Sequence, residues 1–187
     1  NYGVVGGGPM MGPLLTDLSG YITKKDKGFI ILKKDHPLIK RKSYTFDQAR
    51  RINRSACEQC SMCRDLCPRY LLGHNMQPHK MMRVLSYAPD DIQAQLPASL
   101  CCQCNLCEYF SCPANLHPRL TNAIFKQNMA EAKVRYQPTE TEFHVRDARK
   151  YRLVPSKRLV ARLGLREFDQ PAPWTEETIT PAEVHMA

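Results

Sequence analysis

The sequence predicts a mainly α-helical fold with a small β segment near its N-terminal end, and three observations lead to this prediction. Helix-start signals precede apolar faces of helical period at several places after residue 45. Short runs typical of strands are confined to the first 44 residues. All nine cysteines lie between Cys57 and Cys112, among the expected helices. We therefore expect three segments, comprising residues 1–44, 45–135 and 136–187.

Length and composition set the outer limits. The 187 residues carry 27 Lys and Arg against 18 Asp and Glu, and 43% are apolar, as in a folded globular protein of modest core. No window approaches the roughly 18 apolar residues of a membrane span, and the first residues lack the pattern of a secretory signal. We expect neither feature. Because the chain opens on Asn1 within a Gly-rich turn, we also expect it to be a fragment of something longer.

The first segment alternates Gly/Pro turns with short apolar runs. Val4 and Val5 form one run, and residues 29–32 form a second run that is rich in β-branched residues. Because two strands do not make an independently stable sheet, we expect residues 1–44 to be the end of a β-containing domain.

The second segment carries the main helices. Thr45, with Gln48 three residues later, is typical of a capped helix start. Pro78 and Pro118 each suit the first helical position, where the missing N–H costs no hydrogen bond. The apolar faces expected after these prolines are Met81, Met82, Leu85 and Tyr87 in one helix, and Leu120, Ala123, Ile124 and Phe125 in the other.

The third segment is basic and holds one expected helix. Ser156 suits its N-cap, and Gly164 suits the left-handed position just beyond its end. The Pro-rich, acidic residues 169–184 are expected to be extended.

The cysteines form two runs of nearly equal spacing. Residues 57–68 follow C-x2-C-x2-C-x3-C-P, and residues 101–113 follow the same pattern with one residue added before the last cysteine. A connector and a proline-led helix follow each run, so the segment is an internal repeat. Three closely spaced thiolates plus a distant one form the ligand run of [4Fe-4S] proteins. The sequence therefore predicts a helical, ferredoxin-like domain with two [4Fe-4S] clusters.

Eight cysteines are the expected ligands, and the fourth ligand of each cluster has two alternatives. It comes from the same run, or from the other run as in two-cluster ferredoxins. The crossed arrangement gives one cluster to Cys57, Cys60, Cys63 and Cys112, and the other to Cys101, Cys104, Cys107 and Cys67. Zinc is disfavoured, because a third cysteine at the same spacing is redundant in a four-ligand site. Cys102 does not fit the spacing and is expected to be a small buried neighbour.

Thiolate-saturated clusters leave no open position for a substrate. We therefore expect one-electron transfer, with no catalytic residue and no cofactor-binding residue beyond the cluster ligands. Each such cluster carries about two negative charges, so the formal net charge of +9 falls to about +5 in the loaded protein. Much of the basic excess then balances the clusters.

Other motifs are weaker. The glycines of residues 6–12 do not form G-x-G-x-x-G, and a structural turn is favoured over a nucleotide loop. His74, His79 and His117 are expected to be capping or surface residues. The basic runs lack interleaved aromatic residues, so we expect no nucleic-acid partner.

The ordered motifs resemble a known family. GGGPMMG at residues 6–12, CEQCSMCRDLCPRYLLGH at 57–74, CCQCNLCEYFSCP at 101–113 and RLVARLGL at 158–165 are similar to segments of the RnfC-like flavin and iron-sulfur oxidoreductases. This family includes the peripheral NADH-oxidising subunit of the Rnf complex. The added residue in the second run, with CPRYLLGH and ARLGL, favours the branch of cobalamin reductases from propanediol-utilisation microcompartments.

The resemblance implies more than the residues do. It implies that residues 1–44 are part of a β-grasp-like domain, and that FMN and NADH bind on an absent upstream domain or a partner subunit. The chain would then be the iron-sulfur part of an NADH-dependent oxidoreductase in the cytoplasm, inside a bacterial microcompartment in the cobalamin reductase branch. The implied electron acceptor is a corrinoid or a corrinoid enzyme.

Two alternatives stay open. In an Rnf-type ion-translocating complex, the chain would dock on membrane-bound partners and pass electrons to them. In a ferredoxin-like structural subunit, the clusters would mainly hold the fold together, because metal binding itself can drive folding.

Overall fold

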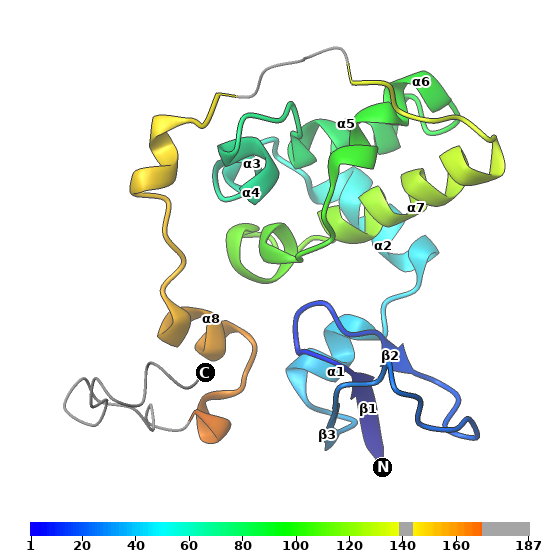
Figure 1. Cartoon of the computed structure of the whole chain (residues 1–187), viewed down its shortest axis with the longest axis vertical. Helices are drawn as coiled ribbons and strands as arrows, with labels where there is room; N and C mark the ends of the chain where they lie inside the picture. Colours follow the sequence, from blue (N-terminus) through cyan, green and yellow to red (C-terminus); the bar gives the residue numbers. More distant parts are fainter. Residues whose placement is uncertain (139–143, 170–187) are drawn as a thin grey trace, which may run out of the picture.

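The computed structural model describes residues 1–138 and 144–169, and its N-terminal part is a small antiparallel sheet (Figure 1). Its strands are β1 (Tyr2–Gly6), β2 (Leu14–Leu15) and β3 (Phe29–Lys33), in the order β2-β1-β3. Val4 pairs with Leu15 on one side and with Ile31 on the other. The two expected strands are present, and β2, which lies after the Gly-rich turn, was not predicted.

The sheet has a core of its own, to which distant segments contribute. Helix α1 (Pro37–Lys42) follows β3 and buries Leu38 and Ile39. The full core comprises Val5, Leu32, Leu38, Ile39, Tyr109 and Leu163. The turn after β1 needs glycine, because a Cβ at Gly12 would lie 2.3 Å from the Gly6 carbonyl oxygen.

A second, helical unit follows in the chain, and Figure 1 shows it packed beside the sheet unit. Its helical segments are α2 (Phe46–Ala56), α3 (Met62–Asp65), α4 (Pro68–Leu71), α5 (Pro78–Tyr87), α6 (Ile92–Gln95), η1 (Leu96–Leu100), η2 (Cys107–Ser111) and α7 (Pro118–Glu131). Its main hydrophobic core lies between α5, η1 and α7 and includes Met76, Met81, Leu85, Phe125 and Met129. The predicted fold class, mainly α with a small β remnant, is confirmed.

The helix starts agree with their sequence signals better than the helix faces do. Thr45 caps α2 in a capping box with Gln48, and α5 and α7 begin at their prolines. Tyr87 is wrong as a core residue, because it ends α5 with 79% of its surface exposed. The buried face of α7 is predicted only in part. Phe125 is buried as expected, but Leu120, Ala123 and Ile124 are half-buried, and the other buried residues after Pro118 are Thr121, Asn122 and Met129.

The chain then passes α4, where the Arg146 N–H donates to the Leu71 carbonyl at 3.0 Å, and returns to the sheet unit. It forms η3 (Asp147–Lys150), α8 (Ser156–Arg162) and η4 (Arg166–Phe168). Pro155, not Ser156, is the N-cap of α8, so that expectation is wrong. Gly164 has φ +73°, as predicted, and the Leu165 N–H donates to the Val160 carbonyl, which completes a Schellman ending. The His36 ring nitrogen Nε2 lies 3.1 Å from the Gly164 carbonyl oxygen and ties α8 to α1.

Two further expectations concern the acidic tail and a membrane span. The extended acidic tail lies, apart from Asp169, outside the described residues. Within the described part of the chain, no helix is both long and apolar enough to span a bilayer.

Candidate metal centres

The two cysteine runs share an unusual backbone. Gln59 and Ser61 in the first run have φ values of 56° and 61°, and the matching Gln103 and Asn105 in the second have 58° and 70°. A left-handed residue other than glycine costs about 1–2 kcal/mol. In both runs the two left-handed residues flank one cysteine, Cys60 in the first and Cys104 in the second, so the two loops have the same backbone conformation. The internal repeat read from the sequence is therefore also a repeat in conformation.

The structure gathers the first four thiols of the crossed arrangement around one small cavity. Cys57, Cys60, Cys63 and Cys112 all line it, together with Met82, Leu116 and other residues. Burial, followed by the neighbouring thiols, raises the pKa of Cys63 to about 12. The pKa of Cys112 is raised as well, and burial is again the largest cause.

The other four thiols lie near one another at the second run. Burial raises the pKa of Cys67, and the nearby Cys101 and Cys102 raise it further. Burial also raises the pKa of Cys104 to about 12, with Cys102 and Cys67 among the neighbours that contribute. Burial holds the pKa of Cys107 well above the ordinary value, and Glu108, Cys101, Cys63 and Cys104 raise it further. Cys67 thus lies among the thiols of the second run, while Cys112 lies among those of the first.

Cys102, expected to be a small buried neighbour, is half-buried. It interacts with Cys104 through a hydrogen bond between their side chains. It therefore lies beside the second group of thiols, as an additional sulfur next to the four.

The donor set fits an iron-sulfur cluster. Raised thiol pKa values mean that these sulfurs need nearby positive charge to ionise, and iron supplies it. Several N–H groups already point at the sulfurs: the Gln59 amide donates to Cys57 Sγ at 3.3 Å, the Gln103 backbone to Cys101 Sγ at 3.4 Å, and the Leu116 backbone to Cys112 Sγ at 3.3 Å. Such bonds stabilise thiolates and influence cluster potentials. Among the described residues, no three Cys, His, Asp or Glu side chains are arranged for a single metal ion.

The residue added to the second run is accommodated as a π-helical turn. In the first run, the Cys67 N–H donates to the Arg64 carbonyl at 2.9 Å, next to the short helix α3. In the second, η2 is π-helical, and the Cys112 N–H donates to the carbonyl of Cys107, five residues earlier, at 3.1 Å. A π turn holds one residue more than an α turn. It also buries Glu108, Tyr109, Phe110 and Ser111.

A buried polar network beside the first centre was missed at the sequence level. His117 was expected to be a cap or surface residue, but its side chain is 3% exposed and lies 3.0 Å from Glu108 through Nδ1 and Oε1. The Asn53 side chain accepts from the His117 N–H at 2.9 Å and donates to its carbonyl at 3.2 Å. The sequence carries no clear signal for this network, because its members are polar residues, and local patterns do not distinguish buried polar residues from exposed ones. His74 and His79 are half-buried, and His79 lines the first cavity.

Comparison with known proteins agrees with the cysteine geometry. The family model described as "4Fe-4S dicluster domain" matches residues 56–117. Cobalamin reductase PduS of Salmonella typhimurium is 40% identical over 94% of this chain and 39% of its own length. Its counterpart in Citrobacter freundii is 38% identical over 93% of this chain and 38% of its own length. The chain therefore spans about two fifths of the curated relatives it matches. No solved structure matches.

A dicluster domain is an electron-transfer unit, because thiolate-ligated clusters take up and release single electrons. The chain contains a 4Fe-4S dicluster domain and is similar, over nearly all of its length, to part of the cobalamin reductases named PduS.

Proposed function

We propose that this chain conducts electrons one at a time through two [4Fe-4S] clusters held by the eight cysteines in the crossed arrangement. The observation that carries the proposal is the exchange of fourth thiols. Cys112 lines the cavity of the first run, and Cys67 lies among the thiols of the second. Both clusters would then share one small domain, and residues 45–135 would form it.

The surrounding residues have defined roles in this proposal. When bound, the clusters supply reversible one-electron oxidation and reduction. Gln59 and Gln103, at matching positions, donate side-chain hydrogen bonds to Cys57 and Cys101 at 3.3 and 3.4 Å. The buried side chains of Met82 and Leu116 pack with Cys112 and Cys57 at the first centre, and the low local dielectric there would strengthen the bond from Gln59.

We further propose that the electrons come from NADH through FMN and leave to a corrinoid. The support is the homology to proteins named cobalamin reductase, over about two fifths of their length. The NADH and FMN sites are proposed to lie on an upstream domain or a partner subunit, with residues 1–44 as part of a β-grasp-like domain between it and the clusters. The proposed location is a bacterial microcompartment, where a corrinoid enzyme is the acceptor.

Serine variants test the crossed ligands. Cys63→Ser and Cys112→Ser should remove the electron paramagnetic resonance signal of the same cluster, and Cys67→Ser and Cys107→Ser should remove that of the other. Each variant should lower the iron content from about eight to about four per chain. Cys102→Ser is the matched control and should retain both signals. If Cys112→Ser and Cys107→Ser removed the same signal, the fourth ligands would be uncrossed.

One observation favours a structural role for the clusters, since Cys67 and Cys112 belong to hydrophobic core clusters. Reductive titration separates the two functions. Clusters that accept electrons while the circular dichroism spectrum stays constant support electron transfer. Clusters that are reduced only as the chain unfolds support a structural subunit.

The acceptor is tested by joining the chain to its native neighbours and adding NADH. Reduction of cob(III)alamin, followed by its absorbance, is the expected result. Reduction of a membrane quinone or a ferredoxin instead would favour the Rnf-type alternative.

A further inference from the structure

The solvent side of α5 carries a row of large side chains. Lys80, Arg83 and Tyr87 are spaced by three and four residues, so they lie on one face of the helix, opposite the buried Met81 and Leu85. All three are exposed, and Tyr87 is 79% exposed. The Arg83 guanidinium lies over the Tyr87 ring, 5.5 Å from its centre. The row contributes nothing to the core, so the fold alone does not explain it.

The row belongs to an open groove that reaches the first centre. The volume of the groove is about 690 Å³, and it is lined by Gln59, His79, Lys80, Arg83, Val84, Tyr87 and Ala88. Gln59 and His79 also line the cavity of the first four thiols. The Gln59 amide donates to Cys57 Sγ at 3.3 Å and to the His79 carbonyl at 3.0 Å. A single side chain therefore links the groove to a sulfur of the first centre.

The first centre also reaches the surface at this place. All nine cysteines lie among the described residues, and Cys60, which directly follows Gln59, is the exposed one. In the second group, Cys101 and Cys104 are half-buried, and Cys67 and Cys107 are buried. A partner outside the molecule can thus approach the first centre more closely than the second, which shortens the path of an electron.

The groove is positively charged. Lys80 and Arg83 line it, and none of its seven lining residues is acidic. The acidic residues nearest in the sequence, Glu58 and Asp90, are not part of the lining. Exposed tyrosine and arginine side chains are the residues that carry most binding energy in protein interfaces, and a basic patch attracts an acidic partner.

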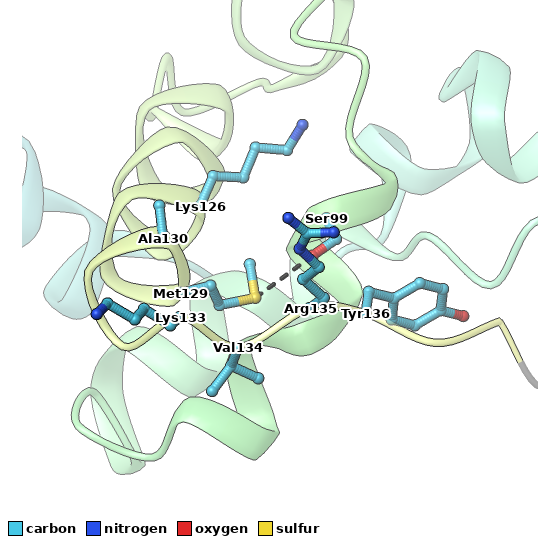
Figure 2. Close-up of a pocket in the computed structure, with 8 residues that line it drawn as sticks. All are labelled: Ser99, Lys126, Met129, Ala130, Lys133, Val134, Arg135 and Tyr136. Atoms are coloured by element: carbon cyan, nitrogen blue, oxygen red, sulfur yellow. Dashed lines mark hydrogen bonds between the residues drawn. The ribbon is translucent and has the colours of Figure 1, made fainter.

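A second basic surface, at the C-terminal end of α7, lacks this arrangement (Figure 2). The Lys126 ammonium is engaged there, because it donates to the Cys101 carbonyl at 2.6 Å. Lys133 has φ +55° at the position after α7 where glycine is usual, and Figure 2 shows its side chain pointing away from Lys126 and Arg135. Arg135 is exposed and lies on the side of the second centre, so it serves below as the control position.

We propose that the groove along α5 is the docking surface for a redox protein with an acidic face, which exchanges single electrons with the first cluster next to Cys60. The inference deepens the proposed electron-transfer function and rests on it. In the direction tested below, one electron leaves the reduced cluster and converts the ferric iron of the partner's haem to ferrous iron, and no bond forms or breaks. Opposite charges steer the encounter, so the reaction should slow as salt is added.

Two haem proteins of opposite charge are the probes. The cluster-loaded chain is reduced anaerobically and mixed by stopped flow with ferric cytochrome b5, which is acidic around its haem, or with ferric cytochrome c, which is basic. Between low and high salt, the rate constant with cytochrome b5 should fall at least about tenfold. The rate constant with cytochrome c should not fall.

Substitutions locate the docking surface. Lys80→Gln and Arg83→Gln should each lower the rate constant with cytochrome b5 at least about threefold at low salt, and much less at high salt. Tyr87→Ala should lower it at both salt concentrations, since the ring contributes contact area and no charge. Arg135→Gln removes the same charge as Arg83→Gln and should leave the rate constant unchanged.

Two results would overturn the proposal. The first is a rate constant with cytochrome b5 that does not depend on salt. The second is an effect of Arg135→Gln as large as that of Arg83→Gln, which would place docking at the second centre or make the net charge alone responsible. A failure of the electron-transfer function is seen separately, because iron content, reduction by dithionite and reoxidation by a small neutral quinone are checked for every variant before mixing.

Discussion

Lys133 carries a conformational cost that can be measured at the scale of one residue. A left-handed lysine costs about 1–2 kcal/mol relative to a relaxed residue, and glycine removes that cost while giving back part of it as chain entropy in the unfolded state. We therefore expect Lys133→Gly to raise the free energy of unfolding by about 0.5–1 kcal/mol. Chemical denaturation measures this difference.

The control for Lys133→Gly lies within the same helix end. Ala130 is helical and exposed, so Ala130→Gly should lower the free energy of unfolding by about 1 kcal/mol. A loss of stability in both variants would mean that Lys133 makes contacts worth more than its strain.

Lys42 predicts a dependence of stability on pH. Its ammonium donates to the carbonyls of Gly12 at 2.5 Å and Met10 at 3.3 Å, and burial, with Arg119 nearby, lowers its pKa to about 8. Between pH 8 and about 10.5 the unfolded chain binds this proton and the folded chain does not, so the contribution of Lys42 to stability rises with pH. Below pH 8 the full cost of the buried charge is present.

The measurement for Lys42 is a comparison of slopes. Lys42→Met should remove this rise. The free energy of unfolding of the wild type minus that of the variant should therefore become more positive from pH 8 to pH 10. Lys40→Met, exposed on the same helix, is the control and should give a constant difference. Working with differences cancels the titration of other groups. A constant difference for Lys42→Met would contradict the low pKa.

Residue types and conformations differ in how well the sequence reveals them. The eight cysteines could be predicted as cluster ligands because cluster binding requires their spacing and few other sites would use it. The left-handed states of Gln59 and Asn105 could not, since glycine is the usual signal and neither residue is glycine. The burial of His117 also depends on Glu108 and Asn53, which only the assembled fold brings together.

At the scale of elements, the π turn η2 connects the two units. Tyr109 projects from it into the core of the sheet unit and is 1% exposed, with the Arg41 guanidinium 4.7 Å from the ring centre. Arg41 also donates to the Glu108 carbonyl at 2.8 Å. The extra residue of the second cysteine run therefore serves the contact between sheet and helices, while Cys112 still reaches the first centre.

This connection predicts the effect of removing the Tyr109 ring. Tyr109→Ala should lower the free energy of unfolding by about 3–5 kcal/mol, as expected for loss of a buried aromatic ring. Limited proteolysis should then cut within residues 1–44 at lower protease concentration, while the cluster spectra persist. Tyr87→Ala, at a ring that is 79% exposed, should change stability by less than about 0.5 kcal/mol. Loss of both clusters in Tyr109→Ala would show that the units do not separate.

Elements with strong local signals were predicted, and those that depend on packing were not. The capping box at Thr45 and the prolines at positions 78 and 118 act within one turn, so their effect is visible in the sequence. Short helices such as α3 and α4 are too brief for a period to show. The buried face of α7 was predicted only at Phe125, because Thr121 and Asn122 are buried as donors to the carbonyls of His117 and Pro118, which hydrophobic periodicity does not reveal.

At the scale of the whole molecule, the described residues form separate cores that differ in their use of sulfur. The core of the sheet unit contains no cysteine. The helical unit has two cores, and both include cysteines of the proposed centres, Cys67 in one and Cys112 in the other. Bound clusters would therefore be part of the interior of the helical unit and would stabilise it directly, since binding free energy is folding free energy in such domains.

Removal of the clusters should consequently affect the two units unequally. After oxidative removal of iron with a chelator, we expect amide hydrogen exchange to become fast in α5 and α7, while β1 and β3 keep their protection. The sheet is the reason for the second half of this expectation, because the backbone pairing of β1 with β3, from Tyr2 with Lys33 to Gly6 with Phe29, needs no metal. Mass spectrometry of loaded and stripped protein, with reloaded protein as the control for reversibility, makes the comparison. Protection that persisted in α5 and α7 would show that the helices pack without clusters, and protection lost everywhere at once would show that sheet and helices fold as a single cooperative unit.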